Sequence, residues 1–398
     1  MDIKMIGCSR RCDTWCVKGL IDAEKLIKME KLYENLLKSN SKSLLRKHLN
    51  RDLYNSLKFI RTHKGITLLE CIKSGLENYD ALIGINAPEP DSYKIFANIF
   101  NPIIEDYHMG FQPNALHPYP RWGDVNAIEN IDPDEKYIRS VRISVSRNLS
   151  YYPFISQLEK HDFRQIQRIV ARAFKALPEE LRGVYRPLKI LSEEEVQEFR
   201  NDHILFENTN PILMSGNVYN YWPSGRGIFY NDNLDFVVWV NQKDHIRVIS
   251  IEENGNIGDV YRRLYKGIGS LTKQLNFCRN RRLGYLTFCP SRLGTTLNIS
   301  VQIKVCYLPR QKNIFKSIAD QRNLVIKRVP GDHPKGVCYY QISNKFSLGK
   351  TEFQFMKEFC DGVSEIISAE QELQEKALAE AALLAEANKE ETSAEEQS

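Results

Sequence analysis

Apolar residues in the first part of the chain recur at the spacing of an amphipathic α-helix. The clearest stripe consists of Leu26, Met29, Leu32 and Leu36. Residues 44–59 continue in the same style, so the pattern predicts helices from Ala23 to about Asn78. A segment rich in Pro, Gly, Asn and His follows over residues 87–126, with a short helical pattern near Tyr93–Phe100. We expect this segment to be mostly loop.

The period of the pattern changes at Tyr137, where apolar and polar residues begin to alternate as they do in β-strands. Residues 138–146 and 297–305 alternate in this way, and the β-rich runs 236–241 and 245–251 are separated by a short turn. Helical patterns occur at residues 163–176, 193–201, 257–276 and 353–367. Strands in hairpins with helices between them predict an α+β domain built on a largely antiparallel sheet.

Charge is unevenly distributed along the 398 residues. The whole chain has a net charge of +5, but residues 369–398 contain nine glutamates and two lysines, so this tail carries −7 and the remainder +12. A basic body suits anionic ligands, although lysines on solvated helix faces give the same balance. The Ala/Glu-rich tail is compatible with a solvated helix and with a disordered segment.

The composition excludes several classes of protein. With 42% hydrophobic residues the chain can form a packed core in two or three domains, and no apolar run approaches the roughly 20 residues of a membrane span. We see no nucleic-acid-binding motif. Nine scattered cysteines without a signal peptide suit reduced thiols in the cytoplasm. The spacing of Cys8, Cys12 and Cys16 matches no common metal site, so we predict no metal centre.

Several sequence strings resemble the signature segments of one enzyme family. They are Trp222–Phe229 (WPSGRGIF), Asn241–Ile249 (NQKDHIRVI), Cys289–Thr295 (CPSRLGT) and Ile342–Lys345 (ISNK), with further matches at Thr67–Leu69, Asp106–His108 and Arg121–Asp124. These strings occur in the family's order over roughly residues 23–368. On these motifs the chain resembles the phosphagen kinases, the ATP:guanidino phosphotransferases, and its length and short specificity loop favour the arginine kinase branch.

The resemblance implies a small all-helical N-terminal domain and a larger α+β domain with an eight-stranded antiparallel sheet flanked by helices. We therefore divide the chain into a cysteine-containing extension (1–22), a helical domain (23–112), a linker (113–136), a catalytic-type domain (137–368) and an acidic tail (369–398). The implied reaction moves the γ-phosphoryl group of MgATP to a guanidinium nitrogen. Such a reaction depends on positioning and on neutralising the charge of the phosphates.

The resemblance implies five phosphate-binding arginines, and only two of them remain. On the polar face of the first strand, Ser140, Arg142 and Ser144 fall in the nucleotide site, with Ser144 in the place of an arginine. Arg247 is retained. Two further arginines of the family are replaced, one by Asn298 and one by Pro330.

Three other residues bear on nucleotide binding. His203 falls at a position that stacks on adenine in the family, where stacking and simple packing both remain open. Arg292 and Arg328 are extra arginines close in sequence to the lost ones, and they could compensate in part. If nucleotide binding is retained, the ligands are MgATP and MgADP.

The acceptor side departs further from the family. Lys243 and Lys335 stand at the positions of the two glutamates that hold the guanidinium, whereas Cys289, the family's thiolate position, is retained. Cys289 is either a reactive thiolate or an inert half-buried cysteine. The substrate loop, with Leu82, Ile83, Gly84, Ile85 and Asn86, lacks the small residues and the tyrosine of arginine kinase. A guanidino substrate is therefore doubtful.

These residues are compatible with three alternative functions. The first, which we favour, is an arginine-kinase-like homologue with weak or no phosphagen kinase activity that retains nucleotide binding or serves in assembly. The second is an active kinase that phosphorylates a guanidino or modified acceptor, with Lys243 and Lys335 attracting an anionic group. The third is a structural, partner-binding module. We expect a cytoplasmic monomer or homodimer.

Overall fold

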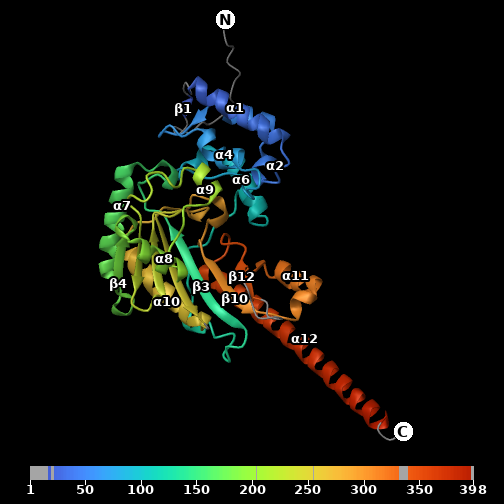
Figure 1. Cartoon of the computed structure of the whole chain (residues 1–398). Helices are drawn as coiled ribbons and strands as arrows, with labels where there is room; N and C mark the ends of the chain where they lie inside the picture. Colours follow the sequence, from blue (N-terminus) through green and yellow to red (C-terminus); the bar gives the residue numbers. More distant parts are fainter. Residues whose placement is uncertain (1–16, 19–21, 203, 254, 331–338, 396–398) are drawn as a thin grey trace.

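A computed structural model describes residues 17–18, 22–202, 204–253, 255–330 and 339–395. The N-terminal part is a cluster of helices beside a two-stranded sheet (Figure 1). Its elements are β1 (Val17–Lys18), α1 (Ala23–Lys38), α2 (Leu44–His48), α3 (Arg51–Leu57), β2 (Ile60–Arg61), α4 (Leu68–Glu77), α5 (Ser92–Ile95) and α6 (Ala97–Tyr107). Cys8, Cys12 and Cys16 lie outside the described residues.

Two expectations for the N-terminal part need correction. The helical pattern over residues 23–78 is interrupted by β2 and a tight turn, in which Thr62 N–H donates to the Ile66 carbonyl and Gly65 has a φ of +82°. The segment expected to be mostly loop contains α6, which reaches Tyr107 because four of its apolar side chains are fully buried. These are Ile99, Phe100, Ile103 and Ile104.

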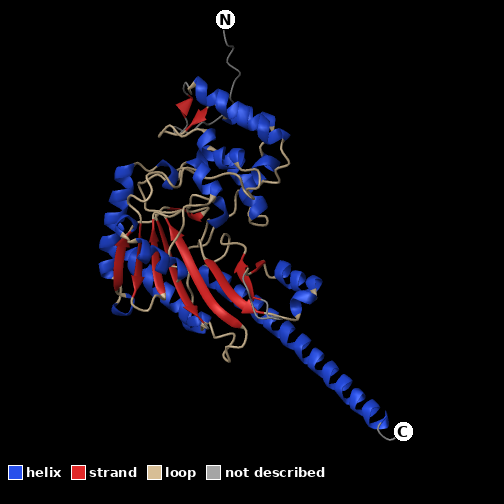
Figure 2. Cartoon of the chain, viewed as in Figure 1, coloured by secondary structure: helices blue, strands red, loops and turns tan. Residues whose placement is uncertain are grey.

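The larger part is built on one eight-stranded antiparallel sheet, which confirms the predicted fold class (Figure 2). Its strand order is β11-β12-β10-β3-β7-β6-β5-β4. The strands are β3 (Ile138–Arg147), β4 (Gly183–Pro187), β5 (Gly227–Asn231), β6 (Phe236–Val240), β7 (Ile246–Glu253), β10 (Asn298–Lys304), β11 (Leu324–Arg328) and β12 (Tyr339–Asn344). A separate small ladder joins β8 (Arg279–Asn280) to β9 (Gly284–Tyr285).

Helices cover the sheet because their apolar stripes match the apolar face of the strands. Val141, Ile143 and Val145 of β3 are fully buried, and α10 (Ile257–Gln274) packs on β3 and β7 through Val260, Leu264 and other buried residues. The remaining helices are α7 (Lys160–Ala173), α8 (Glu193–Asn201), α9 (Pro211–Ser215), α10 (Ile257–Gln274), α11 (Lys312–Gln321) and α12 (Glu352–Glu395).

The acidic tail is helical as far as Glu395. It continues α12, whose first part packs into the core through Met356, Phe359 and Val363. Beyond the body of the protein the same helix extends outwards (Figure 1). Of the two alternatives that the tail sequence leaves open, the structure has the solvated helix. No helix in the described part of the chain is long and apolar enough to span a bilayer.

Candidate active site

A tight turn between β6 and β7 carries Lys243. Asn241 begins the turn with a φ of +57°, its N–H donates to the His245 carbonyl at 2.9 Å, and its side-chain amide donates to the Gly225 carbonyl at 2.7 Å. Asparagine tolerates this left-handed conformation better than most residues do. The turn is thus held at its base, and half-buried Lys243 lies at its tip.

The next residue, Asp244, joins this turn to two other parts of the site. One of its carboxylate oxygens accepts hydrogen bonds from the Asn148 side chain at 2.7 Å and from the Phe288 N–H at 2.9 Å. His245 beside it is fully buried, and burial lowers its pKa to about 3. The neutral ring accepts from the Leu149 N–H and donates to the Pro153 carbonyl. These bonds make the turn a rigid support for Lys243.

Cys289 lies on a segment that is anchored from the N-terminal helices. Tyr93 donates to the Thr287 carbonyl at 2.8 Å, the Ala87 N–H donates to the Phe288 carbonyl at 2.8 Å, and His108 donates to the Pro290 carbonyl at 2.9 Å. The Cys289 thiol lies 3.1 Å from the Ser291 hydroxyl, and a short 3₁₀ helix, η6 (Pro290–Arg292), follows. The described bonds therefore join the two parts of the protein at Cys289.

The substrate loop is fixed on the side of α4. The Asn86 side chain donates to the Ser74 hydroxyl at 2.7 Å, and the Ile83 carbonyl accepts from the Leu45 N–H at 2.9 Å. Gly84 approaches α4 so closely that a Cβ on Gly75 would lie 2.2 Å from the Gly84 carbonyl oxygen. The loop can occupy this place only because position 75 has no side chain.

These elements enclose two adjoining cavities. The strand-side cavity, of about 230 Å³, is lined by Ser144, Ser146, Gln242, Lys243, Asp244, Arg247, Cys289, Arg292, Thr296 and Asn298. The loop-side cavity, of about 250 Å³, is lined by Ser74, Ala81, Leu82, Ile83, Gly84, Ile85, Asn86, Tyr107, Asn210, Ile212, Leu213, Lys243, Cys289 and Ser291. Lys243 and Cys289 line both cavities, so they stand at the boundary between them.

The strand-side cavity is cationic. Arg247 donates from its Nε and Nη2 to the Ser144 hydroxyl, at 3.2 and 3.0 Å. Burial, together with the nearby Arg142 and Arg292 guanidinium groups, lowers the pKa of Arg247 to about 9, so it remains charged at neutral pH. Arg142 and Arg247 both lie over the Trp239 ring, each 5.2 Å from its centroid. Burial lowers the pKa of Arg142 to about 10.

Strand pairing and the η6 turn bring several sequence-predicted residues together. Asn298 of β10 lies directly opposite Ser144 of β3, so two of the positions that lack the family's arginine are neighbours. Arg292 lines the same cavity, and its Nη1 is buried without a hydrogen-bond partner among the described residues. Arg328 is exposed at the end of β11 and lines neither cavity.

Other predicted residues fall elsewhere. Ser140, Arg142 and Pro330 line neither cavity, although all three lie on or next to strands of the sheet. His203 and Lys335 lie outside the described residues, so their predicted roles stay predictions. The sequence motifs alone did not single out Asp244, Tyr107 or Thr296 as site residues. For Asp244 the signal was its place in the turn motif beside Lys243.

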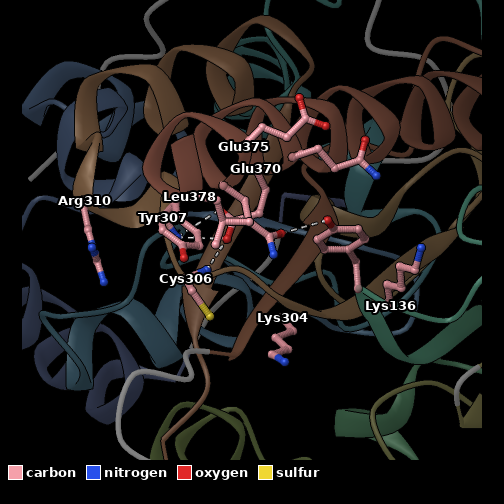
Figure 3. Close-up of a pocket in the computed structure, with 11 residues that line it drawn as sticks. Lys136, Lys304, Cys306, Tyr307, Arg310, Glu370, Glu375 and Leu378 are labelled. Atoms are coloured by element: carbon pink, nitrogen blue, oxygen red, sulfur yellow. Dashed lines mark hydrogen bonds between the residues drawn. The ribbon is translucent and has the colours of Figure 1, made fainter. Parts of the chain in front are cut away.

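A third cavity, of about 960 Å³, lies away from this site, beside the middle of α12 (Figure 3). Its lining includes Lys304, Cys306, Arg310 and Glu375. In Figure 3, Glu370 lies next to the Cys306–Tyr307 segment, and its carboxylate accepts hydrogen bonds from the backbone N–H groups of that segment. The described residues include no group of His, Cys, Asp and Glu side chains that could hold a metal ion.

Comparison with known families matches both parts of the chain. Residues 39–105 match the model of the ATP:guanido phosphotransferase N-terminal domain, and residues 165–373 match that of the ATP:guanido phosphotransferase C-terminal catalytic domain. The helical part and the eight-stranded sheet are those of a phosphagen kinase. The chain belongs to the ATP:guanido phosphotransferase family.

Relatives and solved structures agree with this assignment. The chain is 41% identical to an arginine kinase of Schistocerca americana over 88% of its own length and 99% of that protein. It is 41% identical to the arginine kinase Lit v 2.0101 of Penaeus vannamei, over 89% of its own length and all of that protein. The chain is therefore an arginine-kinase-like phosphagen kinase homologue.

Among solved structures, the fold resembles the substrate-free duplicated taurocyamine kinase of Schistosoma mansoni, with a TM-score of 0.83 and 34% identity. That match covers 87% of this chain and 49% of the other, so this chain spans about half of the duplicated protein. A lombricine kinase gives a TM-score of 0.78 and 31% identity, over 85% of this chain and 94% of that one.

Proposed function

We propose that this family member has weak or no phosphagen kinase activity towards guanidines and retains a nucleotide-binding cavity. The observation that carries the proposal is the ammonium group of Lys243 at the boundary of the two cavities, beside Cys289. In the resembled family a glutamate stands there to hold the guanidinium. An ammonium group repels a guanidinium and cannot accept its hydrogen bonds.

The charge reversal is large on the scale of substrate binding. Two unit charges about 4 Å apart interact by about 4 kcal/mol at an effective dielectric constant of about 20, so replacing attraction by repulsion costs up to about 8 kcal/mol. Solvent screening at half-buried Lys243 reduces this figure. A loss of only about 3 kcal/mol in transition-state binding would still lower the rate more than about 100-fold.

Nucleotide binding is favoured by the cations that the strand-side cavity keeps. Arg247 and Arg292 line this cavity, and Asp244 is its one carboxylate among the described lining residues. The three lost arginines, at Ser144, Asn298 and Pro330, would each have given charge-assisted contacts of about 1.5–3 kcal/mol, so we expect weaker affinity for ADP than in an intact site.

A rate assay and a thermal-shift assay test the proposal. ADP release from MgATP is measured with arginine, creatine, taurocyamine and lombricine as acceptors, with an arginine kinase at equal concentration as the positive control. We expect rates at least about 100-fold lower than the control. The melting temperature is then measured with and without MgADP, and a rise is expected. Turnover close to that of the arginine kinase would overturn the proposed loss of activity.

The second candidate function is an active kinase for a guanidino or modified acceptor. It is favoured by 41% identity to arginine kinases along nearly their whole length and by the position of the Cys289 thiol in both cavities. In the same assay it predicts ADP release that depends on one acceptor of the panel. The absence of any rise in melting temperature with MgADP, together with no turnover, would instead favour a structural, partner-binding role.

The remaining expectations stay predictions. A cytoplasmic location is consistent with the kinship to arginine kinases, and MgATP or MgADP is the expected nucleotide. A monomer or homodimer is expected, without nucleic-acid or membrane partners.

A further inference from the structure

The loop-side cavity combines one positive charge with an apolar wall. Its described lining contains a single charged side chain, Lys243, at the boundary with the strand-side cavity. Leu82, Ile83 and Ile85 of the substrate loop supply apolar surface on one side, and Ile212 and Leu213 of α9 also line the cavity. A volume of about 250 Å³ admits a small molecule and excludes a macromolecular segment of any length.

Lys243 has no ion pair with any residue that the structure describes. The neighbouring carboxylate, Asp244, is buried, and one of its oxygens is already used by Asn148 and Phe288. The next cation, Arg292, also has a buried Nη1 without a partner among the described residues. Partly desolvated cations that lack a counter-ion favour an anionic ligand, because the ligand repays part of the desolvation cost.

We propose that the loop-side cavity binds a small organic oxyanion, a carboxylate or phosphate group on a short aliphatic body. The oxyanion pairs with Lys243 at the boundary with the strand-side cavity, where Cys289 lines both cavities and Arg292 lines the adjoining one. The aliphatic body lies against the substrate loop and Leu213. This inference deepens the proposed function, since it rests on the same loss of guanidinium binding and names the ligand class that replaces it.

The polar groups of the cavity agree with this assignment. The Asn86 side chain is committed to Ser74, and the hydroxyl of Ser291 lies against the Cys289 thiol. A guanidinium has only donors and needs acceptors, ideally a carboxylate, whereas an oxyanion needs donors such as the Lys243 ammonium group, with Arg292 in the adjoining strand-side cavity. Within the described lining, the supply of donors and the positive charge both point to the same class of ligand.

The experiment uses four probes that share a butyl body. They are pentanoate, butyl phosphate, neutral pentanamide and butylguanidinium, titrated against the full chain without nucleotide and followed by ligand-observed NMR. We expect pentanoate or butyl phosphate to bind about tenfold or more tightly than pentanamide, and butylguanidinium to bind more weakly than pentanamide. Whichever of the two anions binds more tightly shows whether the cavity prefers a carboxylate or a phosphate headgroup.

Variants of Lys243 test whether this residue causes the preference for anionic probes. Lys243→Glu should reverse the order, so that butylguanidinium binds better than either anion, and Lys243→Gln should remove the charge preference. Lys304→Glu, at the separate cavity beside α12, is the matched control and should keep the order of the wild-type protein. Thermal unfolding checks that each variant is folded.

Two results would overturn the inference: equal or tighter binding of butylguanidinium by the wild-type protein, and binding of no probe at all. An order of probes that is the same in Lys243→Glu and the wild-type protein would overturn it as well. Because the titrations contain no nucleotide, their failure is distinct from that of the proposed function, which depends on the ADP-release assay.

Discussion

Arg247 of β7 donates two hydrogen bonds to the hydroxyl of Ser144 on β3, at 3.2 and 3.0 Å. In the resembled family, position 144 carries an arginine that grips phosphate alongside Arg247. Here the serine is neutral and orients the remaining guanidinium from within the sheet. The serine at position 144 therefore removes one cation from the cavity and supplies a hydrogen-bond acceptor for Arg247.

We predict that Ser144→Ala lowers the free energy of unfolding by about 1–2 kcal/mol. The mutation leaves the Nε and Nη2 of half-buried Arg247 without the acceptor they share in the described structure. Urea unfolding followed by circular dichroism measures the change. Ser146→Ala is the matched control, because position 146 is on the same strand and its backbone makes the described bonds to Thr296. An equal effect of the two mutations would contradict the prediction.

We predict that Arg292→Gln weakens MgADP binding about tenfold. Arg292 lines the strand-side cavity, and its Nη1 has no hydrogen-bond partner among the described residues, so a phosphate oxygen can accept from it. Isothermal titration calorimetry gives the dissociation constants. Arg328→Gln is the control, since this exposed arginine lines neither cavity. Affinity that falls as much in the control as in Arg292→Gln would show that net charge, and no specific contact, is responsible.

The strands and the helices of the sheet domain could be predicted from periodicity. Strict alternation places Val141, Ile143 and Val145 on one face, and all three are fully buried. Alternation cannot say which strands are neighbours. The pairing of Asn298 with Ser144 depends on strand order, and it could be anticipated only through the family resemblance.

Other features of the site depend on contacts between distant parts of the chain. The direction of Arg292 follows from the η6 turn, which is held by His108 from the N-terminal helices. A local pattern contains no information on such a bond, so Arg292 and Arg328 were equivalent candidates in the sequence. The conformation of the acidic tail cannot be predicted for another reason, because its Ala/Glu composition suits a helix and a disordered segment equally.

We predict that the folded protein loses stability as the pH falls from 6.5 to about 4, because buried His108 stays neutral while the unfolded chain takes up a proton there. Burial lowers the pKa of His108 to about 4 from its ordinary value near 6.5. In this window the unfolded chain binds a proton that the folded chain does not, so stability falls as the pH falls. Between pH 6.5 and 5 the contribution is about 2 kcal/mol.

Comparison with His108→Gln separates this contribution from those of His245 and Glu352, whose pKa shifts have causes that do not include His108. His108 is a minor cause of the lowered pKa of His117, after burial and two arginines, so the contribution of His117 changes little. The glutamine can still donate to the Pro290 carbonyl. Urea unfolding at pH 5.0 and 6.5 should show a smaller loss of stability in the variant than in the wild-type protein. His161→Gln, at a side chain that is 70% exposed, should leave the wild-type loss unchanged. Equal losses in all three proteins would contradict the assigned cause.

The last prediction concerns Glu370, in the middle of α12. Figure 3 shows Glu370 beside Cys306 and Tyr307. Glu370 is 2% exposed, and its carboxylate accepts hydrogen bonds from three consecutive backbone N–H groups, including those of Tyr307 at 2.9 Å and Leu308 at 2.7 Å. These groups precede or begin the 3₁₀ helix η7 (Leu308–Arg310). We expect Glu370→Ala to lower the free energy of unfolding by about 3 kcal/mol, since it leaves buried donors without an acceptor.

Exposed Glu372, two residues further along α12, is the matched control, and Glu372→Ala should change the stability by less than about 0.5 kcal/mol. Hydrogen exchange adds a local measurement. In Glu370→Ala the amides of residues 306–308 should exchange faster, whereas those of β3 should change only as far as global stability does. Unchanged protection at residues 306–308 would mean that the carboxylate does not hold this segment, and that packing of the first part of α12 alone fixes the helix to the sheet.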